Sequence, residues 1–161
     1  MINNRPSGFP TKYRLYSLGE GKRRTAVLII NKSMDAIIVN QLSDEDAVTV
    51  EIKIGSLNII AASMYFDIQG NLELDLIKAQ KILNFAKGKG ILFVIDSNSR
   101  SCLWHDAQTN RRGKTIEDFM IGHNLFILNK DTLLPMFQTI KGSSRIDLTI
   151  CNDQLIKEAH N

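Results

Sequence analysis

The sequence predicts an α/β layered sandwich, in which helices cross back over mixed, largely antiparallel sheets. Three observations favour this class over a simple doubly wound fold. Four short apolar or alternating segments crowd together between residues 25 and 65, an amphipathic segment follows over residues 72–86, and a fully apolar run then occupies residues 91–95. The first and third patterns are typical of strands and the second is typical of a helix.

Composition is consistent with one domain over residues 1–161, because 43% hydrophobic residues and only three prolines suffice for a single core. The net charge of +3 slightly favours an anionic partner such as nucleic acid. Cys102 and Cys151 are far apart in the chain and indicate reduced, intracellular thiols. No apolar run is long enough for a signal peptide or a membrane span, so we expect no membrane partner.

The chain begins with a segment rich in glycine, proline and charge, so we expect an irregular N-terminal arm over residues 1–24 that ends in a basic turn, residues 21–24. The four strands expected next are residues 26–30, 36–39, 48–54 and 57–65. Gly55 and Ser56 give a tight hairpin signal between the last two. The close spacing predicts an antiparallel meander.

The amphipathic helix predicted after Gly70 has apolar residues at three-to-four spacing and ends at residues 87–90, which are basic and glycine-rich. The apolar run 91–95 is then expected to be a central strand covered on both faces. A second amphipathic helix is expected from Gly113 to Gly122. Two further strands, residues 125–128 and 146–150, complete the prediction.

Polar residues follow or interrupt three of these strands. Asp96 and Asn98 come just after the central strand, where ligands of α/β proteins often bind, and an extended backbone would place both side chains on the same side. The alternative is a turn that merely ends the strand. Asp147 interrupts an apolar strand and is either a functional carboxylate or a solvent-facing residue, and Tyr65 closes another strand, where packing is the simpler interpretation.

These residues lie in motifs that resemble those of the endonuclease/exonuclease/phosphatase superfamily. Residues 93–100 with the Leu-Trp-His that follows at 103–105 look like its Gly-Asp-Phe-Asn-Ala type motif, in the form found in arthropod non-LTR retrotransposon endonucleases. Residues 109–114 are similar to the family's Asn-x-Arg-Gly helix start, and residues 144–149 to its Ser-x-Ile-Asp-Leu-Thr element. Tyr65 stands where the family strand ends in a tyrosine. The resemblance spans nearly the whole chain.

The resemblance implies a deoxyribonuclease I-like α/β/β/α sandwich and Mg²⁺-dependent hydrolysis of a phosphodiester in DNA. It implies that Asp96 orients or deprotonates the attacking water, that Asn98 and Tyr65 donate hydrogen bonds to the phosphate, and that Asp147 holds a histidine. The nucleic-acid-binding residues expected are Arg100, Arg111, Arg112 and Ser144. We also expect a nuclear location and, on the same polyprotein, a reverse transcriptase.

The chain departs from the family pattern at both ends, so the resemblance implies an incomplete sandwich and an incomplete site. The family's metal-ligand glutamate lies in a Gln-Glu-Pro strand, and Glu20 is not in that context, so no metal ligand is assigned. The family's histidine follows an aspartate well beyond the Ile-Asp strand. His160 lacks that aspartate and comes too soon, and His105 and His123 are expected at the surface or in packing.

Three functions therefore stay open. The first is a magnesium-dependent DNA endonuclease that nicks a retrotransposon target site. The second is a catalytically inactive remnant that at most binds nucleic acid through the arginines named above and the basic turn at residues 21–24. The third is a phosphatase of the same fold, which the Leu103-Trp104 pair disfavours.

Overall fold

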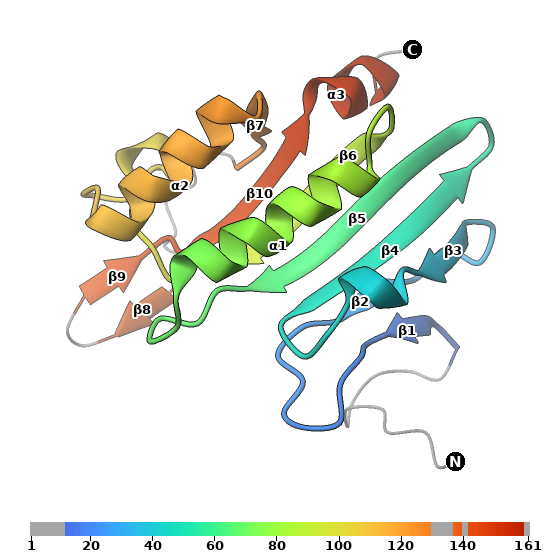
Figure 1. Cartoon of the computed structure of the whole chain (residues 1–161), viewed down its shortest axis with the longest axis horizontal. Helices are drawn as coiled ribbons and strands as arrows, with labels where there is room; N and C mark the ends of the chain where they lie inside the picture. The colour runs from blue at the N-terminus through green and yellow to red at the C-terminus, as the bar shows by residue number, and fades with distance from the viewer. Residues whose placement is uncertain (1–11, 130–136, 140–141, 160–161) are drawn as a thin grey trace.

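A six-stranded mixed sheet organises the computed structural model, which describes residues 12–129, 137–139 and 142–159 (Figure 1). The strand order is β3-β4-β5-β6-β10-β7. Only the β5–β6 pair is parallel in this sheet. The strands are β3 (Asp35–Ile38), β4 (Ala47–Ile54), β5 (Leu57–Tyr65), β6 (Gly90–Asp96), β7 (Leu125–Ile127) and β10 (Asp147–Asn152). The predicted layered α/β class with largely antiparallel strands is confirmed.

The parallel pair exists because a helix carries the chain back across the sheet between β5 and β6. This helix, α1 (Leu72–Phe85), begins at Asn71, whose side chain accepts a hydrogen bond from the Glu73 backbone N–H at 2.9 Å. After the helix Gly88 adopts a φ of 81°, which turns the chain into β6. The amphipathic pattern and the basic, glycine-rich stop therefore predicted this crossover correctly.

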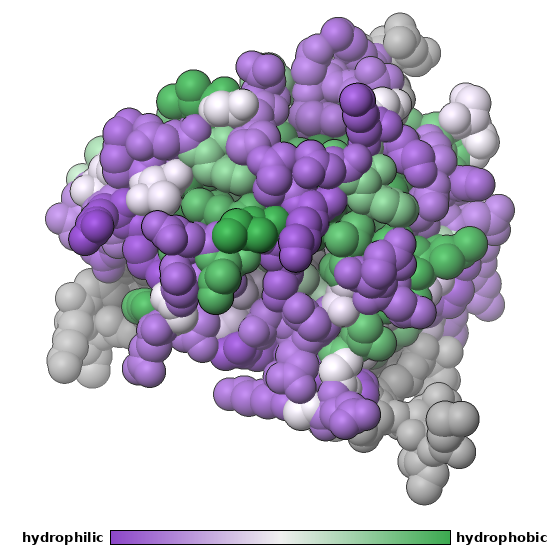
Figure 2. Space-filling model, viewed as in Figure 1, coloured by the Kyte–Doolittle hydropathy of each residue, from purple (hydrophilic) through white to green (hydrophobic). Residues whose placement is uncertain are grey.

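One face of the sheet is covered by α1 and by α2 (Arg111–Gly122), as Figure 1 shows. Because successive side chains of a strand point to opposite faces, every second residue of β5, β6 and β10 enters this core. Figure 2 views the molecule from this side, where hydrophilic residues dominate and hydrophobic ones form small separate groups. Core residues on this face include Ile60, Ala62, Met64, Ile91, Phe93, Ile95, Leu148, Ile150, Ala79, Ile82, Ile116 and Met120.

The opposite face is covered in part by a small second sheet of β1 (Arg14–Tyr16) and β2 (Val27–Ile29). Ile29 packs with residues of β4 and β5, and the Tyr16 hydroxyl donates to the Ala36 carbonyl at 2.6 Å. Two expectations are wrong here. The segment 26–30 does not join the meander, since β2 pairs with β1 instead, and the arm over residues 1–24 contains a strand. Both errors arise because periodicity cannot show with which strand a segment pairs.

Strand β6 is central but is not covered on both faces. The side chain of Val94, which points to the second face, is 47% exposed. The second sheet packs on β4 and β5, and Cys151 at the far end of β10 is buried, so this face stays open around Val94, Asp96 and Asp147. The prediction of a fully covered strand is therefore wrong, and the open face is where the candidate site lies.

Several short elements have no strong sequence signal. They are the 3-10 helices η1 (Asn40–Leu42) and η2 (Cys102–Trp104), the hairpin of β8 (Phe137–Thr139) and β9 (Gly142–Ser144), and the helix α3 (Asp153–Ala159). The fully buried Trp104 donates from Nε1 to the Arg145 carbonyl at 3.0 Å, which fixes the loop after β6 beside the start of β10. None of the helices in the described ranges is both long and apolar enough to cross a membrane.

Candidate active site

Three of the predicted site residues lie in one row across three neighbouring strands. Tyr65 of β5 pairs with Asp96 of β6, and Asp96 pairs with Asp147 of β10. Residues in register on adjacent strands have side chains on the same face, and here that face is the open one. Together with Arg24 and Thr149 they line a depression of about 350 Å³.

The two carboxyl groups of the row are both perturbed. Burial raises the pKa of Asp96, and a hydrogen bond from the Asn98 backbone opposes that shift. Partial desolvation also raises the pKa of Asp147, and the neighbouring Asp96 charge adds to the effect. The Asp96 Oδ1 atom is buried and accepts no hydrogen bond from any residue that the structure describes. A carboxylate with a raised pKa and an unsatisfied oxygen is a competent proton acceptor.

Asn98 does not lie beside Asp96 in the way that an extended backbone would require. Strand β6 ends at Asp96, and Asn98 has a φ of 46°, a left-handed conformation that asparagine tolerates. Its side-chain amide donates to the Phe66 carbonyl at 3.0 Å, which leaves the second amide N–H for another acceptor. The same-side prediction is therefore wrong, and Asn98 instead links the loop after β6 to the residue that follows Tyr65.

The serines between and after these residues hold the loop in place. The backbone and the hydroxyl of Ser97 both donate to the Ile146 carbonyl, at 2.9 and 2.6 Å, and Ser99 donates to Ser97 at 2.7 Å. Ser97 and Ser99 have no exposed surface. Sequence reasoning missed this role, although two small hydroxyl residues flanking an asparagine after a buried strand are a signal for it.

The predicted nucleic-acid-binding residues are dispersed. Arg111 is exposed at the start of α2, and Arg100 is half-buried in the loop before it. The Arg112 Nε and Nη2 atoms are buried without a hydrogen-bond partner in the described structure, and the Arg112 charge opposes the burial that raises the pKa of Asp75. Ser144 lies in β9, opposite Phe137. Arg111 is thus the most exposed of the three arginines in this set.

The histidine partner that the resemblance implied for Asp147 is not supplied by the described residues. His123 bonds to the Phe119 carbonyl through Nδ1 at 2.7 Å and stacks on the Phe119 ring. The His105 carbonyl accepts from Arg145 at 2.6 Å. His160 lies outside the described residues.

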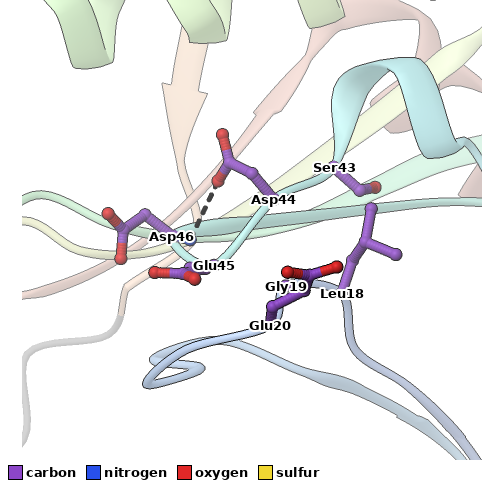
Figure 3. A pocket seen from close by; sticks show the side chains of 7 residues that line it. All are labelled: Leu18, Gly19, Glu20, Ser43, Asp44, Glu45 and Asp46. Atoms are coloured by element: carbon purple, nitrogen blue, oxygen red, sulfur yellow. Dashed lines mark hydrogen bonds between the residues drawn. The ribbon is translucent and has the colours of Figure 1, made fainter.

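A second depression, of about 540 Å³, is acidic (Figure 3). Glu20 lines it with Asp44, Glu45 and Asp46, so Glu20 lies apart from the depression that contains Asp96. Carboxylates at this density repel phosphate, and this depression is therefore unsuited to nucleic acid. Asp46 lines this acidic depression, and its carboxylate bonds to Arg24, which lines the first depression. Asp46 therefore lies between the two depressions.

The donor set fits a magnesium ion only in part. Across residues 12–129, 137–139 and 142–159 no group of three or more histidine, cysteine or acidic side chains could hold a metal. Mg²⁺ keeps several waters, however, and is usually bound by one or two carboxylates plus phosphate oxygens of the substrate. Asp96 and Asp147 supply two carboxylates, and the Asp96 oxygen without a hydrogen-bond partner is free to act as a ligand.

Comparison with known proteins identifies the family to which this chain belongs. The model of the endonuclease–reverse transcriptase family matches residues 59–161, and the chain belongs to that family, within the endonuclease/exonuclease/phosphatase superfamily. A curated relative is the retrovirus-related Pol polyprotein of the type-1 retrotransposable element R1 from Bradysia coprophila, 22% identical over 157 residues. That alignment covers 91% of this chain, which spans only 16% of the polyprotein's length.

Solved structures share the fold. The endonuclease domain of TRAS1, a telomere-specific non-LTR retrotransposon, superposes with a TM-score of 0.81 at 24% identity, over 91% of this chain and 69% of that one. A mannosyl-6-phosphatase from Bacteroides thetaiotaomicron gives a TM-score of 0.62 at 12% identity, over 89% and 64% of the two chains. The deoxyribonuclease I-like fold expected from the sequence motifs is therefore confirmed.

Proposed function

We propose that this chain carries the hydrolytic site of a DNA endonuclease, which cleaves a phosphodiester by an attacking water. The observation that carries the proposal is the row of Tyr65, Asp96 and Asp147 at one level of the open sheet face, in a chain of this family. The similarity to a retrotransposon polyprotein and to a retrotransposon endonuclease domain supports DNA as the substrate, a nuclear site of action and a reverse transcriptase on the same polyprotein.

Asp96, Tyr65 and the neighbouring Asn98 act on the water and the phosphate in this proposal. Asp96 orients the water and accepts its proton through its Oδ1 atom, which has no hydrogen-bond partner among the described residues. The Tyr65 hydroxyl and the second amide N–H of Asn98 donate to phosphoryl oxygens, where negative charge grows in the transition state. Arg111, exposed at the start of α2, contacts a phosphate further along the strand.

Magnesium is the cofactor that we propose for this site. Asp96 and Asp147 would hold it together with water and a phosphate oxygen of the DNA, because the described residues offer no third ligand. When bound, the ion offsets the charge of the phosphate. Binding of Mg²⁺ should therefore be weak for the protein alone and should tighten at least tenfold in the presence of a nonhydrolysable DNA, as isothermal titration calorimetry can measure.

The direct test is nicking of supercoiled plasmid in the presence of Mg²⁺. The Asp96→Ala variant should lower the nicking rate by roughly 10²- to 10⁴-fold, the range expected on loss of a general base. Asp35→Ala is the matched control, since Asp35 is an exposed carboxylate on the edge strand β3 and should leave the rate unchanged. Equal rates for the native protein and Asp96→Ala would exclude the proposed role.

A second candidate function is binding of nucleic acid without cleavage. It is favoured by one observation, the lack of a third metal ligand or a histidine beside Asp147 in the described parts of the chain. This candidate predicts no nicking, together with DNA affinity that falls as salt rises and that weakens in Arg111→Ala. A native protein that nicks plasmid would exclude it, and one that hydrolyses only small phosphate monoesters would point to the phosphatase alternative.

A further inference from the structure

Arg24 lies at the junction of the two sheets and lines the depression that contains Asp96. It is the last residue of the basic turn that one sequence hypothesis assigned to nucleic-acid binding. Its backbone N–H donates to the Glu45 carbonyl at 2.9 Å, so the chain before β2 is tied to the loop before β4. This hydrogen bond therefore fixes the backbone from which the Arg24 side chain extends.

Two carboxylates hold the Arg24 guanidinium. Its Nε and Nη2 atoms donate to the two oxygens of Asp46 in a fork, and Nη1 donates to Asp67 at 2.7 Å. A bidentate arginine–carboxylate pair fixes the plane of the guanidinium as well as its position. With each of its nitrogens bonded and two negative charges beside it, Arg24 is poorly suited to bind a DNA phosphate.

The guanidinium carbon lies 4.8 Å from the centroid of the Tyr65 ring. A cation at this distance over the face of an aromatic ring is attracted to it. Asp46 acts on Tyr65 as well, since its carbonyl accepts a hydrogen bond from the Tyr65 backbone N–H at 2.8 Å. One residue therefore holds both the backbone of Tyr65 and the cation that lies over its ring.

We infer that Arg24 is a positioning residue, which keeps the Tyr65 ring in the row with Asp96 and Asp147 through its attachment to Asp46 and Asp67. The catalytic part of this inference rests on the function proposed above. The geometric part does not, because it concerns only the orientation of the ring. The two parts can therefore be tested separately.

The geometric part is tested by ¹⁹F NMR of protein labelled with 3-fluorotyrosine. The chain has three tyrosines, and loss of one resonance in Tyr65→Phe assigns the signal of interest. Arg24→Ala should shift and broaden that resonance, Asp67→Asn should shift it less because the Asp46 fork is kept, and the exposed neighbour change Lys22→Ala should leave it in place. An unchanged Tyr65 resonance in folded Arg24→Ala overturns the inference whether or not the protein nicks DNA.

The catalytic part is tested by a double-mutant cycle in the nicking assay. Arg24→Ala should lower kcat roughly ten- to a hundredfold with little change in KM, since misplacement of a catalytic group by about 1 Å has an effect of that order. The same change made in Tyr65→Phe should lower kcat no further. Equal losses in both backgrounds, or a loss confined to KM, would show that Arg24 acts on its own and would contradict a positioning role.

Discussion

At the scale of single residues, charge and desolvation compete most visibly at Asp75 of α1. This half-buried carboxyl lies among Lys78, Arg112, Asp46 and Asp67, and burial is the main cause that raises its pKa to about 6 from an ordinary value of 3.8. An acid whose folded pKa is raised binds its proton more tightly in the folded state. The stability that this proton confers is present at low pH and is lost as the pH rises through about 6.

Replacing Asp75 by Asn should therefore stabilise the protein at pH 7 and flatten the pH dependence of stability between about pH 4 and pH 6. The full shift corresponds to roughly 3 kcal/mol, and solvent screening of a half-exposed group reduces it to about 1–2 kcal/mol. Urea unfolding at several pH values measures this directly. Asp35→Asn, which changes an exposed carboxyl on the edge strand β3, is the control and should leave the free energy of unfolding at pH 7 nearly unchanged.

At the scale of elements, the start of α2 is held by a glycine rather than by an apolar side chain. A Cβ at Gly113 would lie 1.8 Å from the Arg100 carbonyl oxygen, so the helix approaches the loop after β6 as closely as a backbone can. Asn110 caps the same turn and accepts from the Gly113 N–H at 2.7 Å. The helix is thereby docked against the loop that carries Asn98.

Gly113→Ala should lower the free energy of unfolding by about 3 kcal/mol or more, because backbone must move to admit the methyl group. Gly122 ends the same helix, and a Cβ there would meet nothing within 4 Å. Gly122→Ala should therefore be neutral or stabilise by roughly 0.5 kcal/mol. Similar effects of the two substitutions on urea unfolding would mean that the close contact does not exist.

Elements with a long periodic pattern could be predicted from the sequence, and those without one could not. The helix α1 and the strands β4, β5 and β6 were expected within two residues of their bounds, since hydrophobic spacing alone decides them. The partner of β2 and the hairpin β8–β9 were not predicted, because pairing is decided by contacts distant in sequence. In the site, Tyr65, Asp96 and Asp147 could be predicted because they lie in sequence motifs. The roles of Arg24 and Ser97 could not, because they depend on contacts between segments that are distant in the sequence.

At the scale of the whole molecule, the two faces of the large sheet differ in what covers them. Helices cover one face over β5, β6 and β10, while the small sheet of β1 and β2 covers the β4–β5 half of the other face. Val94 and Ile95 are neighbours on β6 and point to opposite faces, with 47% and 3% of their surface exposed. Substitutions of Val94 and Ile95 therefore measure separately how much the open face and the core contribute to stability.

Ile95→Ala should cost about 2–5 kcal/mol of unfolding free energy, as expected for a buried aliphatic side chain, and Val94→Ala should cost less than about 1 kcal/mol. Urea denaturation of both variants makes the comparison. A large loss at Val94 would indicate that the second face is covered in solution. The nicking assay on Val94→Ala should show no loss, because Val94 lines the depression without a polar atom to offer.

The parallel pairing of β5 and β6 has a consequence for how this site can change. Both strands end at the level of Tyr65 and Asp96, and β10 begins there with Asp147, so the loops that surround the site leave from fixed anchor points. Beyond the segment 97–100, which is packed in place, residues can be inserted into or removed from those loops without a shift in strand register, because the paired residues of the strands lie before the point where the loops begin. If the chain nicks DNA as proposed above, its target preference can diversify in the loops while the row of Tyr65, Asp96 and Asp147 stays constant, and loop exchange between relatives would test this by the change in cleavage sites.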